Sequence, residues 1–249
     1  MDADIRDLKQ ALAACKRAVV LTGAGISTES GIPDFRSPGG LWEKYTPVYF
    51  QEFLASAEAR DRAWKLKFMM DDSLEGAEPN RGHRAVAKLA RDGIVSAVIT
   101  QNVDGLHQAA SADPIKVIEL HGNTTYAACL DCGARHDLAP IKDAFLADGS
   151  QPRCKECGGL VKAATISFGQ SLPEDALRDA ERETLACDLF LAIGSSLVVH
   201  PAASFPVLAK RAGAKLVILN RDPTDLDSMA DLVIHREIGP TLGAAVGVN

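Results

Sequence analysis

Apolar runs of strand length recur along the chain, and segments with helical spacing of apolar residues separate several of them. The six runs are Ala18 to Leu21, Val95 to Thr100, Lys116 to Leu120, Leu189 to Ile193, Lys215 to Leu219 and Asp231 to Ile234. They are nearly continuous, without alternating polar residues, which is typical of strands buried on both faces of a parallel sheet. The pattern therefore predicts an α/β fold with a doubly wound, Rossmann-like parallel sheet.

Helical spacing opens the chain, where Ile5, Leu8 and Leu12 recur behind an Asp-rich beginning. This periodicity predicts an amphipathic helix over residues 4–17 that leads directly into the first strand. The sequence has no internal repeat and no low-complexity tract.

Two stretches depart from the alternation of strands and helices. Residues 37–78 carry aromatic residues at helical spacing and predict a helical excursion that covers the turn after the first strand. Residues 123–164 are rich in Cys, Gly and Asp and predict a small zinc-binding insert. The Rossmann-like domain is then expected to consist of residues 1–36, 79–122 and 165–249.

Composition limits the partners and the compartment. The 249 residues are 47% hydrophobic, which suffices for a sizeable core, and the formal net charge is −6. An acidic surface argues against binding to nucleic acid or to an acidic membrane, whereas a basic peptide partner is compatible with it. The acidic start and the lack of a membrane-length apolar run predict a cytoplasmic protein. Nothing in the composition indicates the oligomeric state.

Four of the six cysteines form two C-x-x-C pairs, and twenty-one residues separate the pairs. They are Cys129, Cys132, Cys154 and Cys157. Two such pairs predict a tetrahedral zinc site, which is structural because four sulfurs leave no open position. A thioredoxin-like redox pair is the rival, but it needs one pair that opens a helix. His136 is an alternative ligand, and Cys15 and Cys187 are expected to be small buried residues.

A Gly-rich turn, Gly23-Ala24-Gly25-Ile26-Ser27, follows the first strand. Its glycines would let a diphosphate approach the main-chain amides and the start of the next helix. The third glycine of the usual dinucleotide fingerprint is missing, so glycines that serve only the turn are an alternative. Phe35 and Arg36 follow closely; Arg36 could hold a phosphate or be a solvated surface side chain.

Polar residues also follow later strands, where α/β sheets place their ligand-binding groups. The segment Gln101 to His107 includes Asn102 and Asp104, and His121 follows the next strand. An imidazole at this edge can act as a general base near neutral pH. A capped turn and a purely structural histidine are the ordinary alternatives.

Two further strands end in Gly194-Ser195-Ser196-Leu197 and in Asn220-Arg221. Each turn is ordinary when taken alone. Because parallel strands end at one edge, these turns and the first Gly-rich turn could together line one extended cofactor.

These elements, in this order, resemble the sirtuin (Sir2) family of NAD-dependent protein deacylases. The resemblance extends over nearly the whole chain. It rests on Gly23 to Ser27 with Phe35 and Arg36, Ala77 to Asn80 with Gly82 and His83, Gln101 to His107, His121 and Gly122, both cysteine pairs, Phe168 and Gly169, Gly194 to Leu197, and Asn220. It implies removal of acyl groups, most simply acetyl, from protein lysines, with NAD as co-substrate and Zn²⁺ as a structural ion.

The resemblance also implies where NAD would bind. The diphosphate would lie on the turn Gly23, Ala24, Gly25, Ile26 and Ser27, and the adenosine against Gly194, Ser195, Asn220 and Arg221. Asn102 and Asp104 would form the nicotinamide pocket, in which Asp104 holds the carboxamide. The cofactor-binding set further includes Asp34, Phe35, Arg36, Gln101, Ser196 and Ile238.

The implied chemistry has two stages. The acyl oxygen of the acyl-lysine attacks the ribose carbon as nicotinamide leaves, which forms an alkylimidate. His121 then removes a proton from a ribose hydroxyl, which attacks the imidate carbon, and hydrolysis by water gives free lysine and O-acyl-ADP-ribose. Phe35 would shield the intermediate from returning nicotinamide. A dry, preorganised site and one base of near-neutral pKa suit this chemistry.

By the same resemblance, the acyl-lysine peptide would add as a strand between residues 168–172 and 197–199. Ile166, Phe168, Gly169 and Val198 would surround the acyl-lysine beside His121. The chain departs from the family pattern at Ala163 to Ser167 and at Gln170, so we expect the mouth of the acyl channel to differ in shape from that of other members. It also lacks the Tyr and Arg pair of members that prefer acidic acyl groups, because Trp64 to Lys67 occupy that region. We therefore expect uncharged acyl groups.

Three other functions compete with this interpretation. A protein mono-ADP-ribosyltransferase would use the same NAD site but pass ADP-ribose to a protein side chain. An NAD-sensing or zinc-bearing interaction module would bind without catalysis. A Rossmann dehydrogenase is disfavoured by the missing third glycine and by the lack of a site for a hydride acceptor.

Overall fold

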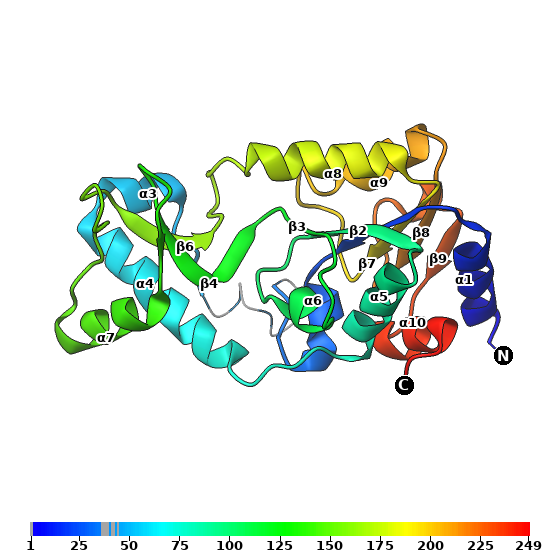
Figure 1. The fold of residues 1–249 in the computed structure, drawn as a ribbon, viewed down its shortest axis with the longest axis horizontal. Coiled ribbons are helices and arrows are strands. Elements are labelled where there is room, and N and C mark those ends of the chain that lie inside the picture. The colour runs from blue at the N-terminus through cyan, green and yellow to red at the C-terminus, as the bar shows by residue number, and fades with distance from the viewer. Residues whose placement is uncertain (1, 36–39, 41–42, 44) are drawn as a thin grey trace.

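The structure, a computed structural model, describes residues 2–35, 40, 43 and 45–249. Six strands of this part of the chain form one parallel sheet in the order β3-β2-β1-β7-β8-β9 (Figure 1). The strands are β1 (Ala18–Thr22), β2 (Val95–Thr100), β3 (Val117–Glu119), β7 (Leu189–Ile193), β8 (Lys215–Leu219) and β9 (Leu232–Ile234). Every apolar run thus forms a strand of the predicted parallel sheet, and only the ends of β1, β3 and β9 differ from the expected bounds.

Helices cover both faces of this sheet, which confirms the doubly wound fold. Val20 belongs to the same buried cluster as Leu242, on the side of α1, α5 and α10. The next residue, Leu21, belongs to a second cluster with Phe205, on the side of α8 and α9. The helices are α1 (Ala3–Ala14), α5 (Arg81–Arg91), α8 (Glu174–Ala186), α9 (Ser204–Arg211) and α10 (Ile238–Val246). Successive residues of a strand point to opposite faces, so each central strand supplies both cores.

The first helix, α1, is shorter than the periodicity predicts. It ends at Ala14 because Cys15 takes an extended conformation, with φ −79° and ψ 152°, before β1 begins. Asp2 caps the helix by accepting a hydrogen bond from the main-chain nitrogen of Asp4. Within the described residues, no helix combines the length and the apolar character that a membrane crossing needs.

A second, three-stranded antiparallel sheet lies at the far end of the molecule from both termini (Figure 1). Its order is β5-β4-β6, and the long helix α4 and the helix α7 lie beside it. The strands of this sheet are β4 (Gly122–Cys129), β5 (Arg135–His136) and β6 (Val161–Thr165), and the helices are α4 (Ala57–Leu74) and α7 (Leu138–Asp148). A short helix, α3 (Phe50–Ala55), precedes α4. We call this sheet, together with α4 and α7, the small domain.

The small domain has its own apolar core, to which α4 contributes the largest side chains. The ring of Phe68 lies 5.5 Å from that of Trp64 and 5.7 Å from that of Phe145 in α7. The same cluster includes Val161 of β6 and Cys129 of β4. The helical excursion therefore packs on the cysteine-rich insert, an association that the sequence alone does not predict. The residue limits of the two segments remain predictions.

Candidate active site

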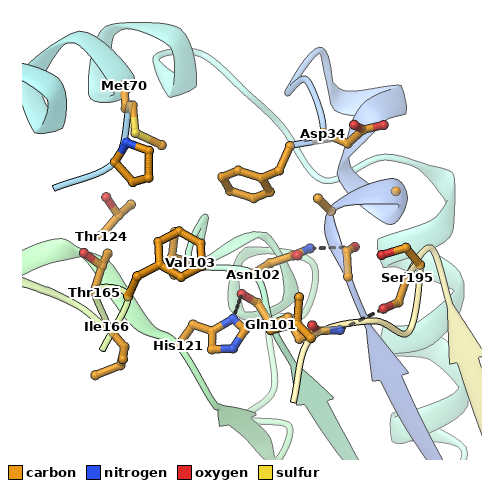
Figure 2. Close-up of a pocket in the computed structure, with 18 of the residues that line it drawn as sticks. Asp34, Met70, Gln101, Asn102, Val103, His121, Thr124, Thr165, Ile166 and Ser195 are labelled. Carbon is orange, nitrogen blue, oxygen red and sulfur yellow. Dashed lines mark hydrogen bonds between the residues drawn. The ribbon is translucent and has the colours of Figure 1, made fainter. Parts of the chain in front are cut away.

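A cavity of about 800 Å³ lies where the carboxyl ends of the large sheet's strands face the small domain. Figure 2 shows Met70, Thr124 and Ile166 on one side of it and Asp34 and Ser195 on the other, with Asn102, Gln101 and His121 between them. Most of the site residues predicted from the strand ends and from the resemblance line this one cavity. They are Gly23, Ala24, Gly25, Asp34, Phe35, Gln101, Asn102, His121, Ile166, Phe168, Gly169, Gly194, Ser195, Ser196, Asn220, Arg221 and Ile238.

Some predicted residues have other positions. Ile26 and Ser27 are 0% and 1% exposed and lie behind the cavity wall. Asp104 also lies behind the wall, bonded to Ser27. Val198 is 49% exposed at the surface. Arg36 lies outside the described residues.

The glycines of the first turn allow two strand ends to touch. The main-chain nitrogen of Gly25 donates to the carbonyl oxygen of Gly194, 2.8 Å away. A Cβ atom on Gly25 would lie 2.8 Å from the Cα of Gly194, and one on Gly194 would lie 2.4 Å from the nitrogen of Ile26. These glycines are needed for the contact between the β1 and β7 turns as well as for an open phosphate site. The chain continues as the 3₁₀ helix η1 (Ala24–Ser30), so no α-helix N-terminus follows the turn.

The side-chain amide of Asn102 is oriented by two hydrogen bonds. Its Nδ2 donates to the carbonyl oxygen of Gly23 at 3.1 Å and to Oγ of Ser27 at 3.2 Å. Ser27 in turn donates to Oδ2 of Asp104 at 2.7 Å, and Oδ1 of Asp104 accepts from the main chain of Leu106. Both donor hydrogens of Asn102 are therefore engaged, and its Oδ1 is the atom available to a ligand.

His121 is held in one tautomer by the end of the neighbouring strand. Its Nδ1 lies 2.9 Å from the carbonyl oxygen of Gln101, which can only accept, so Nδ1 carries the proton. Burial lowers the pKa of His121 below its usual 6.5, although the bond to Gln101 opposes this shift. At neutral pH the imidazole is then uncharged, with a basic lone pair on Nε2. The Gln101 side chain donates to Oγ of Ser195 at 2.9 Å and so joins β2 to the β7 turn.

Phe168 forms one lip of the cavity and packs against Tyr49. Phe168 is 40% exposed, and its ring lies 5.8 Å from that of Tyr49. The main-chain nitrogen of Phe50, at the start of α3, donates to the carbonyl oxygen of Phe168 at 2.9 Å. Gln170 accepts from the main chain of Ser167 through its side-chain oxygen, which closes a turn just beyond the lip. The segment that departs from the family pattern is thus held by local hydrogen bonds.

Two buried lysines in the cavity wall were missed by the sequence analysis. Lys162 donates from Nζ to the carbonyl oxygens of Ala163 and Thr165, and burial lowers its pKa to about 8. Lys67 forms an ion pair with Asp71. The available signal for Lys162 was a charged residue within the apolar run from Leu160 to Ala164. Further lining residues that the sequence did not single out include Thr28, Met70 and Thr124.

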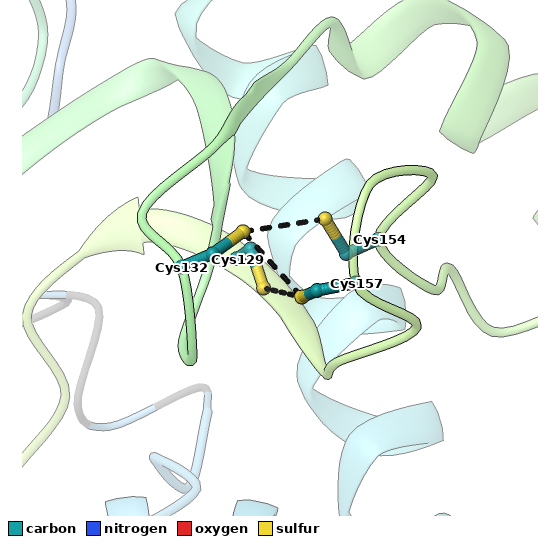
Figure 3. Close-up of side chains that lie close together, drawn as sticks. All are labelled: Cys129, Cys132, Cys154 and Cys157. Carbon is teal, nitrogen blue, oxygen red and sulfur yellow. Dashed lines mark hydrogen bonds between the residues drawn. The ribbon is translucent and has the colours of Figure 1, made fainter.

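The four cysteines of the two C-x-x-C pairs come from two facing loops of the small domain (Figure 3). Their sulfurs all lie within 4.8 Å of one another. The shortest separations are 3.5 Å for Cys129 and Cys157, 3.6 Å for Cys132 and Cys154, and 3.4 Å for Cys132 and Cys157. A tetrahedral zinc ion with bonds of about 2.3 Å would separate its sulfurs by about 3.8 Å, so the cluster fits zinc. His136, the alternative ligand, is not part of it.

The chain is similar to proteins of one family over most of its length. The profile of the Sir2 family matches residues 23–201. A protein named NAD-dependent protein deacetylase from Rhodopseudomonas palustris is 54% identical over 247 residues, which cover 99% of this chain and 98% of that protein. An NAD-dependent protein deacylase 2 from Archaeoglobus fulgidus is 45% identical, over 97% and 94% of the two chains.

Solved structures agree with these similarities. A structure described as Sir2 with a p53 peptide and NAD⁺ has a TM-score of 0.86 and 35% identity, over 97% of this chain and 96% of that one. A Sir2 variant with a deacetylated p53 peptide and 3'-O-acetyl ADP ribose has a TM-score of 0.89 and 35% identity, over 99% and 100% of the chains.

Proposed function

The chain belongs to the Sir2 family and is an NAD-dependent protein deacylase, and from that premise we propose which of its residues carry each step. One observation supports the assignment most strongly. The glycine turn after β1, His121 after β3 and the aromatic lip at Phe168 all line the same cavity. A nucleotide, a base and an acyl-lysine can therefore meet in one place.

We propose that the main-chain amides from Gly23 to Gly25 hold the diphosphate of NAD. The adenosine then lies along the ends of β7 and β8, against Ser195, Asn220 and Ile238, which line the same cavity. The side chain of Asn220 donates to the carbonyl oxygen of Asp222 at 2.7 Å, which supports a fixed wall at this end. When bound, NAD supplies the ribosyl group that accepts the acyl oxygen as nicotinamide departs.

The nicotinamide end is assigned to Asn102, whose Oδ1 is free to accept from the carboxamide. Asp104 lies behind the cavity wall, where its Oδ2 accepts from Ser27 and its Oδ1 accepts from the main chain of Leu106. We therefore propose that Asp104 acts at this subsite by holding Ser27 and Asn102 in place.

His121 is proposed as the general base. Its uncharged Nε2 takes the proton from a ribose hydroxyl, and the resulting imidazolium keeps its Nδ1 hydrogen bond to Gln101. Because a carbonyl oxygen stabilises the charged ring, this bond favours proton uptake at the moment of reaction. General bases of this kind contribute about 10²-fold to 10⁴-fold to a rate.

The acyl-lysine is proposed to enter between Phe168 and Val198, both of which are partly exposed. We infer that it carries an uncharged acyl group, acetyl first. Support comes from Lys67, whose charge Asp71 already neutralises, so the cavity wall does not offer this cation to an acidic acyl chain. A Sir2 structure with a propionylated peptide is consistent with short uncharged groups.

We propose that the zinc ion is structural. Cys129, Cys132, Cys154 and Cys157 would hold the ion as four thiolates, and the ion would supply cross-links that join the two loops. Paired cysteines that serve a metal site are typical of a reducing compartment, which supports a cytoplasmic location as a further proposal.

The test of the function uses the purified protein, NAD and a panel of acyl-lysine peptides, with products measured by mass spectrometry. We expect free lysine peptide, nicotinamide and O-acetyl-ADP-ribose in equal amounts, with acetyl faster than succinyl. Transfer of ADP-ribose to protein without deacylation would instead indicate an ADP-ribosyltransferase. A change in absorbance at the reduced nicotinamide band would indicate a dehydrogenase.

A further inference from the structure

Two buried histidines take no part in the chemistry assigned above. His83 of α5 and His107 of α6 (Leu106–Ala109) are 0% and 1% exposed. Their rings meet edge to face, with centroids 5.0 Å apart. Each ring uses only one nitrogen, because both Nδ1 atoms are buried without a hydrogen-bond partner among the described residues. The one bond that each ring makes leads toward Asn102.

From His107, a chain of hydroxyl groups reaches the main chain of Asn102. Nε2 of His107 lies 2.9 Å from Oγ1 of Thr22. Thr22 donates to Oγ1 of Thr100 at 2.8 Å, and Thr100 accepts from the main-chain nitrogen of Asn102 at 3.1 Å. Since the hydrogen of Thr22 is directed to Thr100, its oxygen accepts from His107, and Nε2 carries the proton of that ring.

His83 reaches the side chain of Asn102 by a second route. Its Nε2 lies 3.4 Å from Oγ of Ser27, the same oxygen that accepts from Nδ2 of Asn102. Burial lowers the pKa of His83 to about 4 and that of His107 to about 3. Both rings are thus neutral at working pH and hold one fixed pattern of donors. Asn102 is held through its main chain by one histidine and through its amide by the other.

We propose that His107 is a positioning residue for the release of nicotinamide: through Thr22 and Thr100 it fixes the main chain of Asn102, so that Oδ1 points into the nicotinamide subsite. The inference rests on the proposed assignment of Asn102 to that subsite. A phenyl ring would fill the space of His107 without burying an unpaired nitrogen, so packing alone does not account for an imidazole here.

The experiment compares His107→Phe, which removes the donor, with His107→Gln, whose side-chain amide can donate to Thr22. The readouts are the exchange of labelled nicotinamide into NAD with an acetyl-lysine peptide present, inhibition by nicotinamide, and the dissociation constant of ADP-ribose. We expect His107→Phe to slow exchange by about tenfold, the size of one buried hydrogen bond lost from the reacting arrangement. The inhibition constant of nicotinamide should rise by a similar factor.

ADP-ribose lacks nicotinamide, so its affinity should stay within about twofold in the same variant. His107→Gln should recover exchange to within about threefold of the wild type. If the affinities for nicotinamide and for ADP-ribose fell by equal factors, His107 would have only a general structural role, and the proposal would be overturned. So would wild-type exchange in His107→Phe.

Thr22→Val provides the test if His107→Phe does not fold, because it removes the relaying oxygen and keeps the shape. Thr184→Val is the matched control, since Oγ1 of Thr184 in α8 is equally buried and makes no hydrogen bond to the described part of the chain. Slower exchange in Thr22→Val alone supports the relay, and equal rates in the two variants overturn it. Absence of exchange in the wild-type protein would count against the proposed function itself.

Discussion

The main-chain nitrogen of Ile166 donates a hydrogen bond of 2.8 Å to the carbonyl oxygen of His121. The wall of the acyl channel is therefore joined directly to the residue that acts as base. Gly122, the next residue, pairs with Thr165 at the start of the β4 and β6 ladder. Any displacement of this junction moves the base and the acyl wall together.

Substitution of Gly122 should break this junction. Gly122 has φ +75°, and a Cβ atom there would lie 2.0 Å from the carbonyl oxygen of Ala164. We expect Gly122→Ala to reduce kcat/KM for the acetyl-lysine peptide by at least about tenfold, because small misplacements of reacting groups are costly. Gly93→Ala is the control, since Gly93 has the same φ and, apart from its chain neighbours, no described residue comes within 4 Å of a Cβ placed there. Equal losses in both variants would mean that backbone strain alone is responsible.

Zinc removal should unfold the small domain first. We expect a strong chelator to release about one ion per chain and to expose Trp64, which is 2% exposed in the folded protein. The check is a red shift of Trp64 fluorescence in a Trp42→Phe background, together with loss of deacylation. Cys154→Ser should behave like chelation, whereas Cys15→Ser should not. Full activity and unchanged emission after complete zinc removal would contradict the structural role.

Because of His83 and His107, we expect the free energy of unfolding to fall in acid. The pKa of His83 is lowered to about 4 and that of His107 to about 3, whereas an unfolded histidine titrates near 6.5. The unfolded chain binds the protons more tightly, so this stability is complete above pH 6.5 and declines as the pH falls toward 4. Each histidine contributes a slope of about 1.4 kcal/mol per pH unit.

Urea unfolding at pH 8, 7, 6 and 5 measures this slope. The free energy of unfolding should be nearly constant from pH 8 to 7 and should fall steeply below 6. His107→Phe should have a shallower slope than the wild type. A free energy that stays constant from pH 7 to 5 would show that the pair does not remain neutral in the folded protein.

Glu183 is expected to matter for stability and not for catalysis. Its buried carboxylate bonds to Lys116 at 2.7 Å and to Arg17 at 2.5 Å, at the edge of the sheet opposite the cavity. Glu183→Gln should lower the free energy of unfolding by about 2 kcal/mol, less than for a fully buried pair because both cations are partly exposed. Exposed Glu181 on the same helix provides the control, Glu181→Gln. A change in the kcat of Glu183→Gln, measured per folded molecule, would show that Glu183 also affects catalysis and would contradict this prediction.

The large sheet could be predicted from the sequence because a strand that is buried on both faces is apolar along its whole length, which a short segment of sequence already shows. The continuous apolar runs locate β2, β7 and β8 to the residue, and parallel strands must bring Gly23, Asn102 and His121 to one edge. The strand-end residues of the candidate site follow from that edge, whereas Asp34, Ile166, Phe168 and Ile238 were expected only from the resemblance to the sirtuin family.

Contacts between distant segments could not be predicted in this way. The aromatic side of α4 could have packed on the large sheet, since periodicity shows which face is buried and not what covers it. The position of Asp104 behind Ser27 and the burial of Lys162 likewise depend on neighbours far away in sequence. Such features arise from packing between elements, and the order of apolar and polar residues along the sequence does not show which elements pack together.

The most direct test of the central claim is the rate of acetyl-lysine removal by His121→Ala beside its dissociation constant for NAD. Because His121 is proposed to act on the ribose hydroxyl and not to hold the nucleotide, deacylation should fall by at least about a hundredfold while NAD binding changes by less than about threefold. Deacylation by His121→Ala at a rate close to that of the wild type would contradict the account.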